Sequence, residues 1–314
     1  MEGWPNPWNG FVTKRAAALV EGAVDLHVHV APSNRHRIAD SRELIDQAAI
    51  FGMRAVLFKD HDRSTVPDAW HASKQNSAVV AAGAICLNAP VGGLNPAAAE
   101  AALQMGARAV FLPTDSARND TQFWNELGDA SVRAHAVQED QKQYSAQLDA
   151  LDDTGRLRPE IQAVIDLCGE AGALVCTGHL NSEEISAVVT SCAARGARVC
   201  ITHAPVFSGA HADLLSSWAA AGAILELVAI FCCGAGRLPE SARRSYAQEA
   251  ALIEAVGASA FALSTDLGQA GNPMPAAGLV EFVDGLLGEG IPEDDIALMT
   301  RTNPAWALGL DPVR

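Results

Sequence analysis

Five side chains able to bind a metal ion stand at the ends of strand-like segments of this sequence. His27 and His29 are two residues apart in the apolar run 23–30, so in a strand both side chains would point to the same face. Three later apolar runs each end on a further candidate ligand: 173–179 on His179, 198–203 on His203 and 258–266 on Asp266. Neutral imidazole and carboxylate groups bind zinc, and also manganese or iron. Any one of these histidines alone is more often an ordinary core or loop residue, but the whole set predicts a divalent-metal site.

The segments that carry these residues alternate with amphipathic stretches from residue 23 onward, as βα units do. Strands are predicted at 23–30, 54–59, 79–87, 107–113, 173–179, 198–203, 223–228 and 258–266. Helices are predicted at 41–50 with Ser41 as the N-cap, around 67–75, up to 104, at 160–169, 182–195, 279–287 and 296–308. Eight strands with intervening helices favour a (β/α)8 TIM barrel over an open doubly wound sheet. The position of the candidate ligands decides this, because all of them fall at the C-terminal ends of strands.

The domain organisation follows from what interrupts this pattern. No linker divides the chain, so residues 1–314 are predicted to form one domain with an N-terminal extension at 1–20. The polar segment 115–159 lies between the fourth and fifth strands and exceeds the usual length of a connection, which predicts a lid-like insertion or a small appended subdomain. Within it, 151–157 is predicted as a turn between two short extended pieces.

Composition restricts the class of protein. The chain has 49% hydrophobic residues, and its 37 acidic and 22 basic residues give a net charge of −15. Such a charge disfavours binding to nucleic acid or to anionic membranes, and no apolar run approaches the ~20 residues of a membrane span. The N-terminus does not have the pattern of a signal peptide, and seven cysteines, several within strand-like runs, are typical of thiols in a reducing compartment. The expectation is a cytoplasmic protein that acts on a small molecule, with homo-oligomer formation left open.

Several motifs resemble those of a known superfamily. Residues 25–30, 177–179, 202–203 and 264–266 resemble the metal motifs of the amidohydrolase superfamily, and 302–310 resembles its C-terminal helix signature. The stretches 92–96 and 112–114 resemble a bacterial branch of unknown function, the DUF6282-like proteins. The resemblance begins at about residue 20 and implies a metal-dependent hydrolase. It implies that His27, His29 and Asp266 hold the more buried metal, that His179 and His203 hold the more exposed one, and that Asp266 transfers a proton from the attacking water to the leaving group.

The chain departs from the superfamily pattern at the ligand that bridges two metals. Phosphotriesterase-like members place a carboxylated lysine at the end of strand four, where this chain has Thr114. The nearest substitute is Lys59, at the end of the second strand, which would face inward with Leu57 and His61 while Val56 and Phe58 face outward. A lysine aimed at a metal site repels it unless the lysine is neutral, carboxylated or bound to an anionic substrate. We expect Lys59 to be a carbamate bridge or an anchor for a substrate carboxylate, with the bridge slightly favoured, and an ordinary rim lysine is the competing interpretation.

Five further side chains are candidates for the site. His61 is a candidate ligand, proton donor or orienting residue, and these three roles remain unranked. Glu226 is an acid within an apolar strand, which predicts either a role inside the barrel or a salt bridge at the strand end. Asn88 and Thr114, at the ends of the third and fourth strands, are predicted to line a substrate pocket. Thr177 is predicted to orient a ligand.

The expected reaction is attack by metal-activated water on the carbonyl carbon of an amide, cyclic amide, lactone or ester. Two metals are favoured because five ligands and a bridge exceed the needs of one tetrahedral ion, and Zn²⁺ is expected first, with Mn²⁺ or Fe²⁺ as alternatives. A metal-dependent decarboxylase of the same superfamily is one alternative function. A non-catalytic metal- or ligand-binding barrel is another, and Asp266 counts against it because storage needs no carboxylate placed to accept a proton.

Overall fold

The computed structural model describes residues 13–127, 147–233, 238 and 240–310. Most of the predicted N-terminal extension (1–20) lies outside the described residues, as does 128–146 of the predicted insertion. The single-domain and lid predictions therefore stay predictions. No helix in the described part of the chain is both long and apolar enough to span a bilayer.

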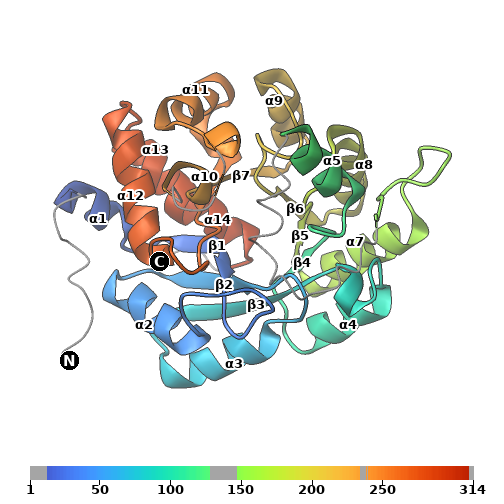
Figure 1. Ribbon diagram of the computed structural model, residues 1–314, viewed down its shortest axis with the longest axis horizontal. Helices are drawn as coiled ribbons and strands as arrows, with labels where there is room; N and C mark the ends of the chain where they lie inside the picture. Colours follow the sequence, from blue (N-terminus) through green and yellow to red (C-terminus); the bar gives the residue numbers. More distant parts are fainter. Residues whose placement is uncertain (1–12, 128–146, 234–237, 239, 311–314) are drawn as a thin grey trace.

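Eight parallel strands form the centre of the molecule, in the order in which they occur in the sequence. They are β1 (Val24–His29), β2 (Ala55–Lys59), β3 (Val80–Cys86), β4 (Ala109–Phe111), β5 (Leu174–Cys176), β6 (Arg198–Ile201), β7 (Ile224–Val228) and β8 (Phe261–Ser264). Backbone hydrogen bonds join the segment after β8 to β1: His29 N donates to Leu267 O at 2.8 Å, and Asp266 N donates to His27 O at 2.8 Å. The sheet thus closes on itself, which confirms the predicted (β/α)8 barrel (Figure 1).

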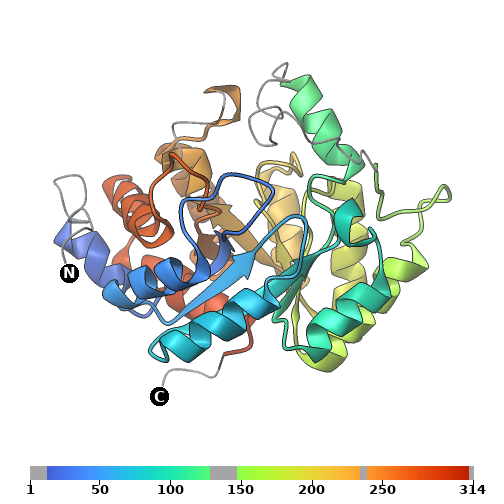
Figure 2. The same cartoon turned by 60° about the horizontal axis from the view of Figure 1, so that its bottom comes forward.

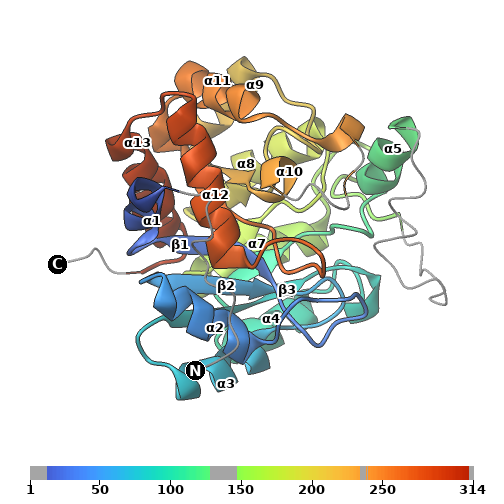
Figure 3. The same ribbon diagram turned by 60° about the vertical axis from the view of Figure 1, so that its left-hand side comes forward.

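Helices surround these strands. They are α1 (Lys14–Val20), α2 (Ser41–Ile50), α3 (Val66–Gln75), α4 (Pro96–Gln104), α5 (Arg118–Glu126), α7 (Pro159–Ala171), α8 (Ser182–Arg195), α9 (Ala212–Ala220), α10 (Ile230–Cys233), α11 (Tyr246–Val256), α12 (Pro275–Gly288), α13 (Glu293–Ala297) and α14 (Asn303–Ala307). A π-helical turn at Leu298–Thr302 joins α13 to α14. Figure 3 shows α1 beside α12 and α13, which it contacts.

The start of α2 differs from the prediction in one residue. Asp40, not Ser41, is the N-cap, because its carboxylate accepts hydrogen bonds from Arg42 N at 2.9 Å and Glu43 N at 3.0 Å. The Glu43 side chain accepts from Asp40 N in return, which completes a capping box. Ser41 is the first residue of the helix.

The apolar core has two layers, inside the barrel and between barrel and helices. In β2, Val56 and Phe58 belong to the layer under the helices, and Leu57 belongs to the layer inside the barrel. This is the predicted alternation, and it turns the next inward residue, Lys59, toward the barrel axis. Lys59 is 1% exposed, so the barrel interior encloses a basic side chain.

The described part of the predicted insertion contains one expected and one unexpected feature. Leu151 pairs with Leu157 in an isolated antiparallel bridge, which confirms the predicted turn. Helix α5 was not predicted, and Figure 2 shows it (green) at the edge of the barrel. Asp120, in α5, is a buried acid with 3% of its surface exposed.

Candidate metal centre

The five candidate ligands come together at the C-terminal end of the barrel. His27 and His29 lie in β1, while His179, His203 and Asp266 lie two or three residues beyond β5, β6 and β8. The histidine rings form a continuous row, with centroid separations of 5.3 Å between His29 and His27, 5.1 Å between His27 and His203, and 5.2 Å between His203 and His179. Four histidines from three parts of the sequence thus share one site.

Asp266 lies between the histidines. Its Oδ1 is 3.1 Å from His27 Nε2 and 2.9 Å from His29 Nε2, and its Oδ2 is 3.1 Å from His203 Nε2. Burial acts to raise the pKa of Asp266, but the charges of His27 and His203 and its hydrogen bonds outweigh burial and hold that pKa well below its usual value. Asp266 is therefore a carboxylate at neutral pH.

The backbone at two of these residues is in the left-handed region. Asp266 has φ 52° and His203 has φ 43°, which are rare values for residues other than glycine. Conformations of this kind cost on the order of 1–3 kcal/mol each and cluster at functional sites. Asp25 anchors the segment before Asp266, because it accepts hydrogen bonds from Thr265 Oγ1 at 2.6 Å and Thr265 N at 3.1 Å. Burial raises the pKa of Asp25 to about 7.

The residues present fit a divalent cation. One donor atom from each of His27, His29 and Asp266 lies within 4.8 Å of the others, and His27, His203 and Glu226 form a second such group. Among the described residues, His29 Nδ1 and His203 Nδ1 are buried without a hydrogen-bond partner. Burial lowers the pKa of His27, and it holds the pKa of His29 well below its usual value. Both shifts favour the neutral imidazoles that bind metals.

Two buried carboxylates orient the histidines from behind. Glu226 Oε2 lies 3.2 Å from His27 Nδ1 and accepts a hydrogen bond from His203 N at 3.3 Å, so Nε2 of His27 remains for the centre. Asp120 Oδ1 lies 2.8 Å from His179 Nδ1 in the same way. Burial lowers the pKa of His179 to about 4. Carboxylates in this position raise the basicity of a histidine ligand and fix its tautomer.

Lys59 and His61 adjoin the centre. Lys59 Nζ lies 2.9 Å from His27 Nε2 and 4.8 Å from the centroid of the Phe111 ring. The His61 ring stacks on His29 with centroids 4.8 Å apart, and burial, then the charge of Arg35, hold the pKa of His61 well below its usual value. The prediction that both side chains point into the barrel agrees with these contacts, and their roles stay predictions.

Asn88 and Thr114 hold the loops that follow β2, β3 and β4. Asn88 Nδ2 donates to His61 O at 3.0 Å and to Thr114 Oγ1 at 2.7 Å, while its Oδ1 accepts from Thr114 N at 2.8 Å. Thr114 Oγ1 also lies 3.0 Å from His61 Nδ1. Both side chains are therefore engaged inside the protein, and their predicted contact with substrate stays a prediction. Thr177 Oγ1 accepts from Thr202 N at 3.1 Å, immediately before His203.

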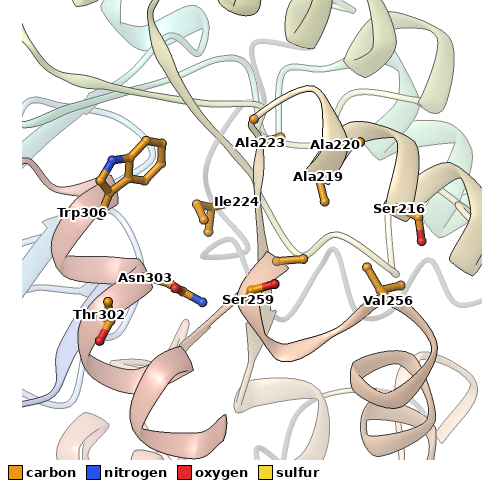
Figure 4. Close-up of a pocket in the computed structure, with 12 residues that line it drawn as sticks. Ser216, Ala219, Ala220, Ala223, Ile224, Val256, Ser259, Thr302, Asn303 and Trp306 are labelled. Atoms are coloured by element: carbon orange, nitrogen blue, oxygen red, sulfur yellow. The ribbon is translucent and has the colours of Figure 1, made fainter.

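A cavity of about 550 Å³ lies at the opposite end of the barrel (Figure 4). It is bounded by α9, α11 and α14, with Ile224 and Trp306 among its lining residues. The described residues that line it carry no ionisable side chain. Acid–base and metal chemistry therefore belongs to the histidine-lined end.

Several solved structures of other proteins share this fold. Solved structures with this fold include an amidohydrolase from Pseudomonas aeruginosa (TM-score 0.59, 13% identity, 94% of this chain and 97% of that chain). The probable dipeptidase PvdM from the same species (0.58, 11%, 94% and 97%) and YjjV, a TatD homologue from Escherichia coli K12 (0.53, 12%, 92% and 98%), share it as well. These likenesses show the barrel fold of this chain, and no curated protein matches it in sequence. A family model matches residues 22–226, and the protein belongs to that family, DUF6282, a family of unknown function.

Proposed function

We propose that the protein is a metal-dependent hydrolase that cleaves an amide, cyclic amide, lactone or ester bond of a small molecule. The observation that carries the proposal is the position of Asp266, whose two carboxylate oxygens face His27 and His29 on one side and His203 on the other. A single carboxylate among histidines can both bind a metal and accept a proton. The amidohydrolase and the probable dipeptidase that share the fold support this proposal.

The proposed roles of the ligands follow from their chemistry. His27, His29 and Asp266 would hold one divalent cation, with zinc the first choice, and His203 and His179 are available for a second. Bound there, the metal would polarise the substrate carbonyl and lower the pKa of a water toward ~7.

The chain's own groups would carry the proton. Asp266 is charged at neutral pH, so one of its oxygens can accept a proton from the attacking water and deliver it to the leaving-group atom. Glu226 holds Nδ1 of His27, which keeps that ring in a fixed orientation during the transfer.

Replacing Asp266 tests this proposal. In the zinc-loaded full chain, Asp266→Asn is expected to lower kcat by about 10²–10⁴-fold, because the amide cannot accept the proton. The histidine ligands remain, so zinc stays bound, as measured by elemental analysis. Turnover is measured on a panel of amides, cyclic amides, lactones and esters. Asp166→Asn, at an exposed carboxylate on α7, is the control and should leave kcat unchanged.

Three results would contradict the proposal. Unchanged turnover in Asp266→Asn would remove this residue from the mechanism. A wild-type protein with neither stoichiometric metal nor activity on the panel would exclude hydrolysis by this route. Release of carbon dioxide without incorporation of water would identify a decarboxylase instead.

A further inference from the structure

The loop that follows β1 holds an arginine over the metal-ligand cluster. Arg37 pairs with Gln269 in an antiparallel bridge, and the neighbouring Ile38 N donates to Gly268 O at 2.8 Å. Gly268 itself directly follows the segment that bonds to His29. Arg37 is thus fixed at the rim between the ends of β1 and β8, which supply His29 and Asp266.

One edge of the Arg37 guanidinium is unused. Its Nε and Nη2 are shielded from solvent and have no hydrogen-bond partner among the described residues. These two nitrogens lie on the same edge of the planar guanidinium, and one N–H bond of each points outward in parallel. This edge matches the two oxygens of a carboxylate or of a phosphate, which is why arginine binds such groups in a bidentate manner.

No described acidic side chain forms an ion pair with this edge of Arg37. Asp60, Asp62 and Asp266 attract it and Arg35 repels it, but none of the described acids forms an ion pair with Arg37. Arg35, by contrast, forms an ion pair with Asp115. Burial, then the charge of Arg35, lowers the pKa of Arg37 to about 10, so Arg37 stays charged at neutral pH.

Three basic side chains lie among the acids at this end of the barrel. Lys59, Arg35 and Arg37 all lie at this end of the barrel, in a protein whose net charge is −15. Arg35 is paired with Asp115, whereas the Nε and Nη2 donors of Arg37 are free, so Arg37 is available to an anionic ligand.

We propose that Arg37 binds a carboxylate of the substrate, close to the bond that is cleaved. That the ligand is a substrate rests on the proposed hydrolase function. That it carries a carboxylate rests on the free edge of the guanidinium. One edge with two donors fits one carboxylate group. A phosphate shares this chemistry, and the experiment separates the two.

The test compares ligands that differ only in charge. N-acetylalanine and its carboxamide, N-acetylalaninamide, contain the same acetylated amine, and only the first has a carboxylate. Binding of each, and of inorganic phosphate, is measured by calorimetry on the zinc-loaded full chain. Carboxylate and carboxamide pairs are also included in the hydrolysis panel. Wild type should bind the acid about 10–100-fold more tightly than the amide, the range that a bidentate charged pair supplies.

Three variants assign the preference to Arg37. Arg37→Gln should reduce the preference to about 2-fold, and Arg37→Lys, which keeps the charge but lacks the paired donors, should be intermediate. Arg195→Gln, at an exposed arginine on α8, should keep the wild-type preference. Thermal unfolding shows which variants are folded. If Arg37→Gln does not fold, the acid preference of Arg37→Lys tests the inference.

Each remaining outcome separates the inference from the proposed function. An acid preference that persists in the folded Arg37 variants overturns the inference, as does equal binding of acid and amide by wild type. Tighter, Arg37-dependent binding of phosphate replaces the carboxylate assignment. Arg37-dependent binding of the acid without any hydrolysis would refute the hydrolase and keep the anion site. Equal hydrolysis of acid and amide, unaffected by the Arg37 variants, would keep the hydrolase and refute the anion site.

Discussion

Lys59 is the residue whose surroundings most constrain its chemistry. Its Nζ is buried and lies 2.9 Å from Nε2 of His27, the nitrogen that also faces Asp266. A protonated amine there repels any cation held by His27. Carboxylation would turn the amine into an anion that can bridge two metals, whereas an ammonium would have to be offset by an anionic substrate.

A carbamate on Lys59 can be detected directly. In zinc-loaded protein equilibrated with ¹³C-bicarbonate, we expect a carbamate carbon signal in wild type that is absent from Lys59→Met. Zinc content should fall from two ions to one in that variant because the bridge is lost. Lys74→Met, at an exposed lysine on α3, should retain both the signal and the zinc. A wild-type protein with no signal and zinc content unaffected by Lys59→Met would leave Lys59 as a substrate anchor.

The residues of the site differ in how far sequence predicts them. His27 and His29 carry a spacing that has a geometric meaning in a strand, and His179, His203 and Asp266 each end an apolar run. Asp120 and Arg37 lie in a polar helix and a loop, where an acid or a base is ordinarily a solvated surface residue. Only the folded chain brings Asp120 against His179 and leaves an edge of Arg37 free.

At the scale of elements, the turns after the strands set the positions of the ligands. Gly178 lies between β5 and His179 with φ +62°. A Cβ atom there would approach Pro113 O to 2.3 Å and Leu112 O to 2.4 Å, distances that real side chains do not tolerate. His179 N donates to Pro113 O at 2.9 Å. The close approach of the Gly178 backbone to residues 112 and 113 therefore holds His179 next to the end of β4.

Two glycine substitutions separate the steric contact from backbone strain. Gly196, after α8, has φ +65° but nothing within 4 Å of its Cβ position. Gly196→Ala should cost about 1 kcal/mol, the strain of a left-handed alanine, and Gly178→Ala about 3 kcal/mol or more because backbone must also move. Urea unfolding of both variants measures the difference. Equal losses of stability would show that the turn after β5 tolerates a side chain.

The sequence pattern predicts all eight strands but not helices α5, α9 and α11, and several element ends differ from the prediction. Apolar runs located all eight strands, because strands of a parallel barrel are covered on both sides. The ends of β5, β6 and β8 fall two or three residues before the predicted ends, since Gly178, His203 and Asp266 have left-handed backbones that cannot continue a strand. Helix α5, with the sequence RNDTQFWNE, has only two apolar residues, Phe123 and Trp124, so its sequence resembles a polar loop.

At the scale of the whole molecule, the candidate centre joins distant parts of the barrel. β1 contributes His27 and His29, the turns after β5 and β6 contribute two more histidines, and the segment after β8 contributes Asp266. These elements span most of the described chain and meet only after the barrel has closed. A cation bound by all of them would therefore bind the folded chain and not the unfolded one.

Zinc should consequently stabilise the fold as a whole. At a free concentration 100 times the dissociation constant, a ligand of the native state adds about 2.7 kcal/mol, which raises Tm by roughly 4 °C in a chain of this length. Differential scanning calorimetry of metal-depleted protein, with and without zinc, measures the shift. Magnesium at the same concentration is the control and should have little effect, because it prefers oxygen ligands over imidazole. The absence of a zinc-dependent shift, or an equal shift with magnesium, would mean that the histidine cluster does not select a transition metal.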